Sequence, residues 1–240
     1  MPLRAERYRA LSSVVGTAIM LIGLWPVAGL IPVPDPNWSA EQLTRFYQDH
    51  TGALRAGLFI GLIGMGAYGP LCASITRRML RMQPRQPALA YTQLAAATVG
   101  WVFLVLPILI MSAAAYRPGR AAETTQGMHD IAWFVLVMDF VPFCVQYIAI
   151  AAAVFLDRSP VPVFPRWVAY LSLWVTVLFI PTGVVTFFKT GPFTYGGLLG
   201  FYVPLAVFVI WLVSMPYAIC GDLRREELES SAEHSEPSNA

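Results

Sequence analysis

Six long apolar stretches constrain the fold of this chain more than any other feature of its sequence. A helix of about 20 apolar residues crosses the ~30 Å hydrocarbon core of a bilayer, and each stretch reaches that length. A soluble domain of 240 residues has no interior in which six such helices could be buried. The sequence therefore predicts an all-α fold, an integral membrane bundle of six transmembrane helices surrounded by the lipid bilayer. The predicted helices cover residues 11–31, 53–76, 88–116, 130–156, 167–188 and 197–220.

The composition agrees with a membrane protein. Hydrophobic residues make up 57% of the chain and charged residues 12%, whereas soluble proteins contain about 25% charged residues. The formal net charge of +2 is too small to support nucleic acid as a partner. The first apolar stretch is longer than the ~7–15 residues of a signal-peptide core, and no small-residue cleavage site follows it. We therefore expect this stretch to be retained as a membrane helix.

The basic residues are divided unevenly between the two sets of connecting segments. Eleven lie at the termini and in the even-numbered connections, and five lie in the odd-numbered ones. Because cytoplasmic segments are enriched in Lys and Arg, this asymmetry predicts that both termini are cytoplasmic. The expected location is a bacterial inner membrane or an equivalent one. The first set is Arg4, Arg7, Arg9, Arg77, Arg78, Arg81, Arg85, Arg158, Arg166, Arg224 and Arg225, and the second is Arg45, Arg55, Arg117, Arg120 and Lys189.

The chain divides into one membrane domain and two terminal segments. Residues 1–10 are the predicted cytoplasmic N-terminus, and residues 11–220 form the transmembrane domain. Residues 221–240 are acidic and rich in Ser, Glu, Asn and Pro. Such a segment buries too little apolar surface to offset its chain entropy, so we expect a disordered tail or an amphipathic helix that fades into disorder.

A short external helix is expected over residues 39–50. Ser39 and Gln42 have the spacing of a capping box, and Trp38 and Leu43 have that of a hydrophobic staple. The apolar side chains that follow recur at helical spacing on one face. The helix is expected to lie on the outer membrane surface, either as a connector or as a lid over an external cavity.

Prolines and glycines interrupt the apolar stretches. The prolines are expected to produce either static bends or hinges whose freed backbone carbonyls line a cavity. In the second stretch, Gly57, Gly61 and Gly64 provide a small-residue face that favours close helix packing in lipid. This face predicts a central place in the bundle, and it is also the expected contact if the chain forms a homo-oligomer. The prolines are Pro26, Pro70, Pro107, Pro142, Pro181, Pro204 and Pro216.

Asp139 is the most informative single residue. It lies about 15 Å from the outer end of the fourth stretch at 1.5 Å per residue, which is close to the bilayer midplane. A carboxylate there is costly unless it is paired, hydrated or protonated, and such residues face the bundle interior. Gln146 and Tyr147 follow seven and eight positions later, so a continuous helix places them on the same face, and Tyr68 is expected within reach. Asp139 is therefore either a ligand-binding group or a hydrogen-bonded acid that holds helices together.

Arg55, His50 and His129 are further candidates, all predicted near the external side. Arg55 either extends outward to the interface or binds an anionic group at the mouth of the bundle. The two histidines are weak candidates for metal or axial haem ligation, although their spacing forms no known motif. No disulfide is expected, because Cys72, Cys144 and Cys220 lie in or at the ends of membrane helices.

These observations support three hypotheses about function. The first is a bundle with an outward-facing polar cavity that binds or transports a small molecule, with Asp139, Gln146, Tyr147, Tyr68 and Arg55 as ligand-binding residues. The second is a membrane-embedded enzyme or haem protein that acts on a lipophilic substrate. The third is a non-catalytic assembly subunit that docks through its glycine face. The sequence contains no nucleotide-binding glycine loop and no GxSxG motif, so it leaves open whether a reaction is catalysed.

Overall fold

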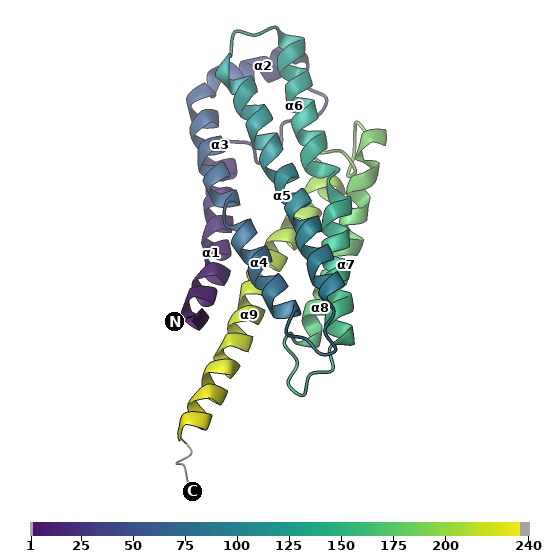
Figure 1. The fold of residues 1–240 in the computed structure, drawn as a ribbon. Helices are drawn as coiled ribbons and strands as arrows, with labels where there is room; N and C mark the ends of the chain where they lie inside the picture. Colours follow the sequence, from purple (N-terminus) through teal and green to yellow (C-terminus); the bar gives the residue numbers. More distant parts are fainter. Residues whose placement is uncertain (1, 236–240) are drawn as a thin grey trace, which may run out of the picture.

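The structure is a computed structural model that describes residues 2–235, with side chains described for residues 5–228. All regular elements in this part of the chain are helices. Six helical segments are long and apolar enough to cross a membrane, and they lie side by side in one bundle (Figure 1). The structure thus confirms the prediction of an all-α, six-span membrane bundle.

Most of the six spans are built from more than one helical element. The third span is the exception, a continuous helix α5 (Pro87–Tyr116). The other spans are α1 (Pro2–Ile22) with the π-helix η1 (Gly23–Val27), α3 (Thr51–Met65) with α4 (Tyr68–Met79), α6 (Ala122–Val137) with α7 (Phe140–Leu156), α8 (Arg166–Phe179) with the 3-10 helix η2 (Ile180–Phe187), and the π-helix η3 (Leu198–Tyr202) with α9 (Val203–Ser235).

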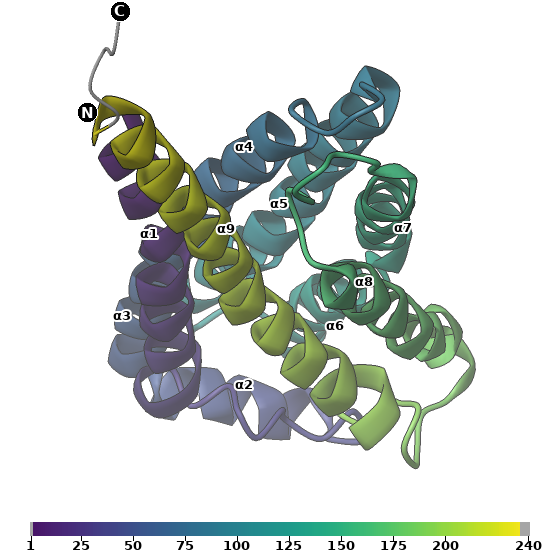
Figure 2. The ribbon, with the colours of Figure 1, turned by 90° about the horizontal axis from the view of Figure 1, so that it is seen from below.

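The N-terminal part of α1 and the C-terminal part of α9 lie at the same end of the bundle, and the short helix α2 (Ala40–Asp49) lies at the opposite end (Figure 1). We call these the terminal end and the α2 end. Seen from the terminal end, α9 crosses the bundle obliquely, between α1 on one side and α8 on the other (Figure 2). An even number of spans accounts for the shared end of the termini.

Several prolines begin helices instead of bending them. Pro70 and Pro142 are the third residues of α4 and α7, and Pro204 is the second residue of α9. The first turn of a helix leaves its N–H groups without helical partners, so a proline there loses nothing. By contrast, Pro107 lies inside the unbroken α5. The second and fourth spans are therefore interrupted part-way, at residues 66–67 and 138–139.

The glycines of the second span form a seam with α1. A Cβ atom on Gly64 would lie 2.5 Å from the carbonyl oxygen of Gly16, and one on Gly23 would lie 2.5 Å from the amide nitrogen of Gly61. The backbones of α1 and α3 are therefore in direct contact, as expected where small residues meet in lipid. Because α1 of the same chain packs on these glycines, they are not exposed for a homo-oligomer contact in this structure.

The helix α2 begins as the sequence predicts. The backbone N–H of Ser39 donates to Gln42 Oε1 at 2.8 Å, and the N–H of Gln42 donates to Ser39 Oγ at 3.3 Å. The buried side chains Leu43, Thr44 and Tyr47 pack α2 against the bundle, chiefly against α6. Thus α2 lies across the end of the helices.

Charged side chains at the terminal end join α1, α4 and α9. Arg78 is only 1% exposed, and its guanidinium pairs with Glu6 at 2.7 Å, Asp222 at 2.5 Å and Glu226 at 2.7 Å. We call these four residues the Arg78 cluster. It holds the first part of the predicted tail against the bundle, and α9 continues to Ser235. Of the two alternatives predicted for residues 221–240, the structure has a helix and not a disordered segment as far as residue 235, and residues 236–240 lie outside the described residues.

Candidate ligand site

Asp139 lies at the break in the fourth span. It is the residue before the first turn of α7, with φ −78° and ψ 43°, and its side chain makes no capping hydrogen bond to that helix. An aspartate at this position usually accepts from the N–H of the second or third helical residue. The third residue here is Pro142, which has no N–H. The proline therefore removes one of the two usual donors. The Asp139 carboxylate makes no hydrogen bond to the other one either.

The carboxylate is buried without compensation. Asp139 is 8% exposed, and its Oδ2 atom has no hydrogen-bond partner within the described part of the chain. No ion pair to Asp139 occurs among the described residues. A buried carboxylate in this state lowers the stability of the fold unless a proton, water or another group satisfies it.

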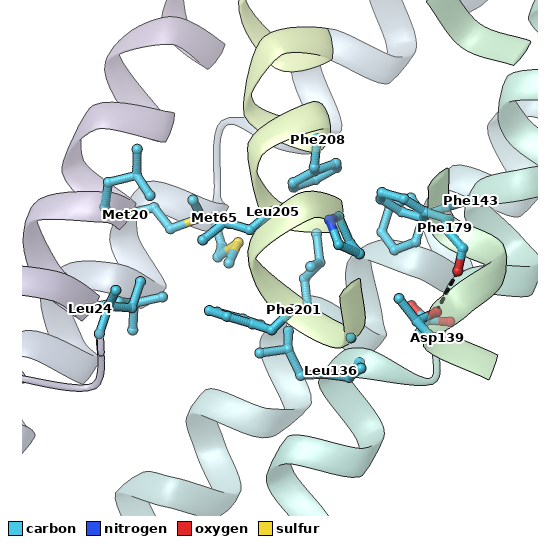
Figure 3. A pocket seen from close by; sticks show the side chains of 17 residues that line it. Met20, Leu24, Met65, Leu136, Asp139, Phe143, Phe179, Phe201, Leu205 and Phe208 are labelled. Atoms are coloured by element: carbon cyan, nitrogen blue, oxygen red, sulfur yellow. Dashed lines mark hydrogen bonds between the residues drawn. The ribbon is translucent and has the colours of Figure 1, made fainter. Parts of the chain in front are cut away.

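Asp139 lines a cavity of about 100 Å³ inside the bundle. Apart from Asp139 and Thr182, its lining side chains are apolar, and no Lys, Arg or His of the described residues is among them. Figure 3 shows the carboxylate at one side of this cavity and Met20 and Leu24 at the other. The cavity is lined by Met20, Leu21, Leu24, Ile31, Met65, Leu104, Leu136, Val137, Asp139, Phe143, Phe179, Thr182, Gly200, Phe201, Pro204, Leu205 and Phe208.

The one other polar side chain of the lining is already satisfied. The hydroxyl of Thr182 donates to the carbonyl of Phe179 at 2.7 Å, the bond drawn as a dashed line in Figure 3. Four phenylalanines contribute ring surface to the same cavity. The cavity therefore combines a mainly apolar, aromatic wall with one unpaired acid. The sequence analysis predicted a polar cavity, and its wall is in fact mainly apolar.

Gln146, Tyr147 and Tyr68 belong to a different place in the bundle. The Tyr68 hydroxyl donates to Gln146 Oε1 at 2.6 Å, so Tyr68 reaches Gln146 and not Asp139. Neither Gln146 nor Tyr147 lines the Asp139 cavity, and the Tyr147 ring packs on Trp211. The predicted polar stripe from Asp139 to Tyr147 is wrong, because the break at residues 138–139 interrupts the helical periodicity on which it relied.

Arg55 is an exposed capping residue at the α2 end. Its guanidinium donates to the carbonyl oxygen of Ala115 at 3.1 Å and to that of Tyr116 at 2.9 Å. These are carbonyls of the last turn of α5, which lack helical partners. Arg55 does not line the Asp139 cavity. The structure therefore does not bring Arg55 to this cavity, and a ligand-binding role for it stays a prediction.

The two candidate histidines lie in different surroundings. His50 is exposed, and its Nδ1 contacts the carbonyl oxygen of Phe46 at 2.9 Å. His129 is 1% exposed, and its Nδ1 lies 3.0 Å from the Tyr47 hydroxyl. Neither lines the Asp139 cavity, and the described residues contain no group of three or more His, Cys, Asp or Glu side chains placed to hold a metal. The geometry gives no support to joint ligation of a metal or haem by these histidines.

A second, polar space opens at the α2 end. It has a volume of about 300 Å³, and we call it the outer cleft. The sequence analysis missed it, because its charged residues Asp35 and Lys189 lie in connections 154 positions apart. The outer cleft is lined by Val33, Asp35, Pro36, Asn37, Lys189, Thr190, Gly191, Thr194, Gly196 and Gly197.

The fold and the cavity together define a class: a polytopic membrane protein with an unpaired acid at the wall of an apolar cavity. Comparisons with protein-family models, with curated proteins and with solved structures each give no match to this chain. Any statement about its function therefore depends on the chemistry of the site.

Proposed function

We propose that the protein binds or transports a small lipophilic molecule that carries one cationic or proton-donating group, with Asp139 as the partner of that group. The observation that carries this proposal is the Oδ2 atom of Asp139, which is buried and unpartnered at the wall of an otherwise apolar cavity. Sites for small molecules commonly combine an apolar wall with a few polar groups that fix the orientation of the ligand.

The lining favours a cation over a neutral donor. An ammonium group would supply the positive charge that the cavity lining lacks. Aromatic rings attract cations through their faces, and Phe143, Phe179, Phe201 and Phe208 surround the cavity. A ligand with an ammonium group and a hydrocarbon body would therefore match both features of the wall.

The size of the cavity restricts the hydrocarbon body. Engineered protein cavities of roughly 150 Å³ bind benzene, and this cavity measures about 100 Å³. A single ring or a short alkyl chain is therefore the expected size, unless the surrounding helices move apart. If the termini are cytoplasmic, as the charge asymmetry predicts, the α2 end and the outer cleft lie outside the cell, and the expected entry is from that side.

Binding of a matched pair of probes tests the proposal. The protein in lipid nanodiscs is titrated with 4-fluorobenzylamine and with 4-fluorobenzyl alcohol, followed by ¹⁹F NMR, with empty nanodiscs as the partition blank. A hydrogen bond to a charged group contributes about 1.5–3 kcal/mol. We therefore expect Asp139→Asn to weaken binding of the amine by about 10- to 100-fold and to change binding of the alcohol much less.

Asp130→Asn is the matched control. Asp130 lies in the same span, but it accepts a hydrogen bond from the Tyr195 hydroxyl at 3.2 Å and does not line the cavity. This variant should bind the amine like the wild type. The proposal fails if the amine binds no better than the alcohol, or if the two aspartate variants weaken amine binding equally. Uptake of the amine into vesicles would then separate transport from binding alone.

A further inference from the structure

We propose that residues 31–37, which we call the strap, form a gate between the outer cleft and the Asp139 cavity. The inference deepens the proposed function, since it names the route by which a ligand would reach Asp139. It starts from two spaces that lie next to each other at the α2 end. Of the two chain segments between them, the strap makes the fewer backbone hydrogen bonds.

Only a thin layer of backbone separates the two spaces. On the strap, Ile31 lines the cavity and Val33, two residues further on, lines the outer cleft. On the opposing segment, Gly200 lines the cavity and Gly197 lines the outer cleft. The cleft and the cavity are thus separated by two short chain segments that face each other. Movement of either segment would connect the two spaces.

The opposing segment is tightly folded. The N–H groups of Leu199 and Gly200 both donate to the carbonyl of Pro192, at 2.7 and 3.1 Å, and the N–H of Gly197 donates to the carbonyl of Thr194 at 2.9 Å. A Cβ atom on Gly197 would lie 2.5 Å from the Pro192 oxygen. This turn is closed on itself by backbone hydrogen bonds, so it provides the fixed side of the gate.

The strap is held to its surroundings by long hydrogen bonds. Within the described residues, two such bonds join it to other elements: the N–H of Val33 donates to the Tyr202 hydroxyl at 3.3 Å, and the Asn37 amide donates to the carbonyl of Lys189 at 3.2 Å. The strap contains no helix or strand. Segments with few backbone hydrogen bonds open at low cost in free energy.

The two ends of the strap suit a hinged movement. Gly29 precedes it with φ 65°, a left-handed conformation that other residues rarely adopt. Beyond the other end, Ser39 caps α2, which is packed on the bundle. The strap therefore runs from a left-handed glycine turn to a firmly anchored helix, and the Tyr202 hydroxyl is hydrogen-bonded to its middle.

A disulfide between the strap and the fixed turn tests the gate. A Cβ atom on Gly196 would lie 3.3 Å from Val33 Cβ, close to the ~3.5–4.5 Å found in disulfides. In Val33→Cys/Gly196→Cys, oxidation should slow exchange of 4-fluorobenzylamine by at least tenfold, and reduction should restore it. The two single variants, under the same oxidant, are the controls. Equal exchange rates in the oxidised and reduced forms would overturn the gate.

A second measurement uses no amine ligand, so it tests the gate independently of the proposed amine binding. Thr182→Cys places a thiol in the cavity, and a permanently charged trimethylammonium methanethiosulfonate is added outside reconstituted vesicles. Labelling at residue 182 is followed by peptide mass. Adding Tyr202→Phe should raise the labelling rate several-fold, because it removes the strap's hydroxyl acceptor, whereas adding Tyr68→Phe should leave the rate unchanged. A thiol at residue 182 that stays unlabelled, or a rate that Tyr202→Phe does not change, excludes the gate even if amines bind.

Discussion

The Arg78 cluster and the Asp139 cavity bury ionisable side chains in opposite ways. Arg78 is 1% exposed and has three carboxylates within 2.7 Å, contributed by α1 and α9. Asp139 is 8% exposed, and its Oδ2 atom has no partner among the described residues. Both sites lie within spans long enough to cross a membrane.

The contrast shows how to distinguish a structural charge from a functional one. A buried charge whose partners are all present holds elements together, and removing one partner leaves the others uncompensated. A buried acid without partners does not hold elements together, so Asp139 is a candidate for a role other than folding. The two sites should therefore respond to mutation with opposite signs in stability.

The largest effect is expected at the Arg78 cluster. Arg78→Leu leaves three carboxylates without their central cation and should lower the free energy of unfolding by about 3–5 kcal/mol. The measurement is thermal or denaturant unfolding in detergent. Arg77→Ala is the control, because Arg77 is half-exposed and, among the described residues, pairs with Glu6 alone, at 3.0 Å, so it should cost under about 1 kcal/mol. Equal losses in the two variants would contradict the interpretation of the cluster.

Asp157 provides an intermediate case, a buried acid satisfied by neutral donors. It lies in the connection between α7 and α8 and accepts from Ser159 Oγ at 2.5 Å and from the N–H groups of Ser159, Val163 and Gln83 at 3.0–3.2 Å. Asp157→Ala leaves these donors unpaired and should cost about 2 kcal/mol of unfolding free energy. Unfolding at neutral pH measures it, and a loss below about 0.5 kcal/mol would contradict it.

The same residue predicts a pH dependence. Burial acts to raise the pKa of Asp157, but its hydrogen bonds outweigh burial and hold the pKa below its ordinary value of 3.8. The unfolded chain therefore binds this proton more readily than the folded chain does. The stabilisation is present above about pH 4 and is lost as the pH falls through the lowered pKa. The stability difference between wild type and Asp157→Ala should shrink in that range, and a difference independent of pH would refute this assignment.

Substitution of Asp139 should change the free energy of unfolding in the opposite direction. Asp139→Leu replaces an unpartnered carboxylate by an apolar group in an apolar cavity, and it should raise the free energy of unfolding by about 1–2 kcal/mol. The same variant should lose binding of the amine probe. Unfolding and ¹⁹F titration of one sample measure both. Destabilisation by this variant would show that Asp139 supports the fold, and the comparison with Arg78 would then break down.

The smallest effect is expected at Arg55. Arg55→Ala removes an exposed cap from the end of α5 and should cost about 0.5–1 kcal/mol of unfolding free energy. Amine affinity should stay at the wild-type value, because Arg55 does not line the cavity. A clear change in amine affinity would instead show that Arg55 takes part in ligand binding.

Features that depend on residues close together in the chain could be predicted from the sequence. The six apolar stretches are recognisable because each contains enough consecutive apolar side chains to cross a bilayer. The start of α2 is recognisable because Ser39 and Gln42 bond within one turn. Asp139 was correctly expected to be buried, since a carboxylate amid apolar residues avoids lipid.

Features that depend on residues far apart in the chain could not be predicted from the sequence. Arg78 and Asp222 are 144 positions apart, and nothing local indicates that they pair. The phenylalanines that line the cavity belong to helices whose lipid-facing side chains are also apolar. The sequence pattern therefore does not show which apolar residues line a cavity and which face lipid. Gln146 was misplaced because a period of 3.6 residues applies only to a continuous helix, and the fourth span is broken at Asp139.

The glycine seam between α1 and α3 has a mechanical consequence. Helices that meet through side chains can slide or rotate by changing rotamers, but here the carbonyl of Gly16 faces the backbone of Gly64 with no side chain between them. Any shift of one helix along the other would force main-chain atoms into overlap. We therefore expect these two helices to behave as one rigid body, so that the strap moves without any sliding of α1 along α3.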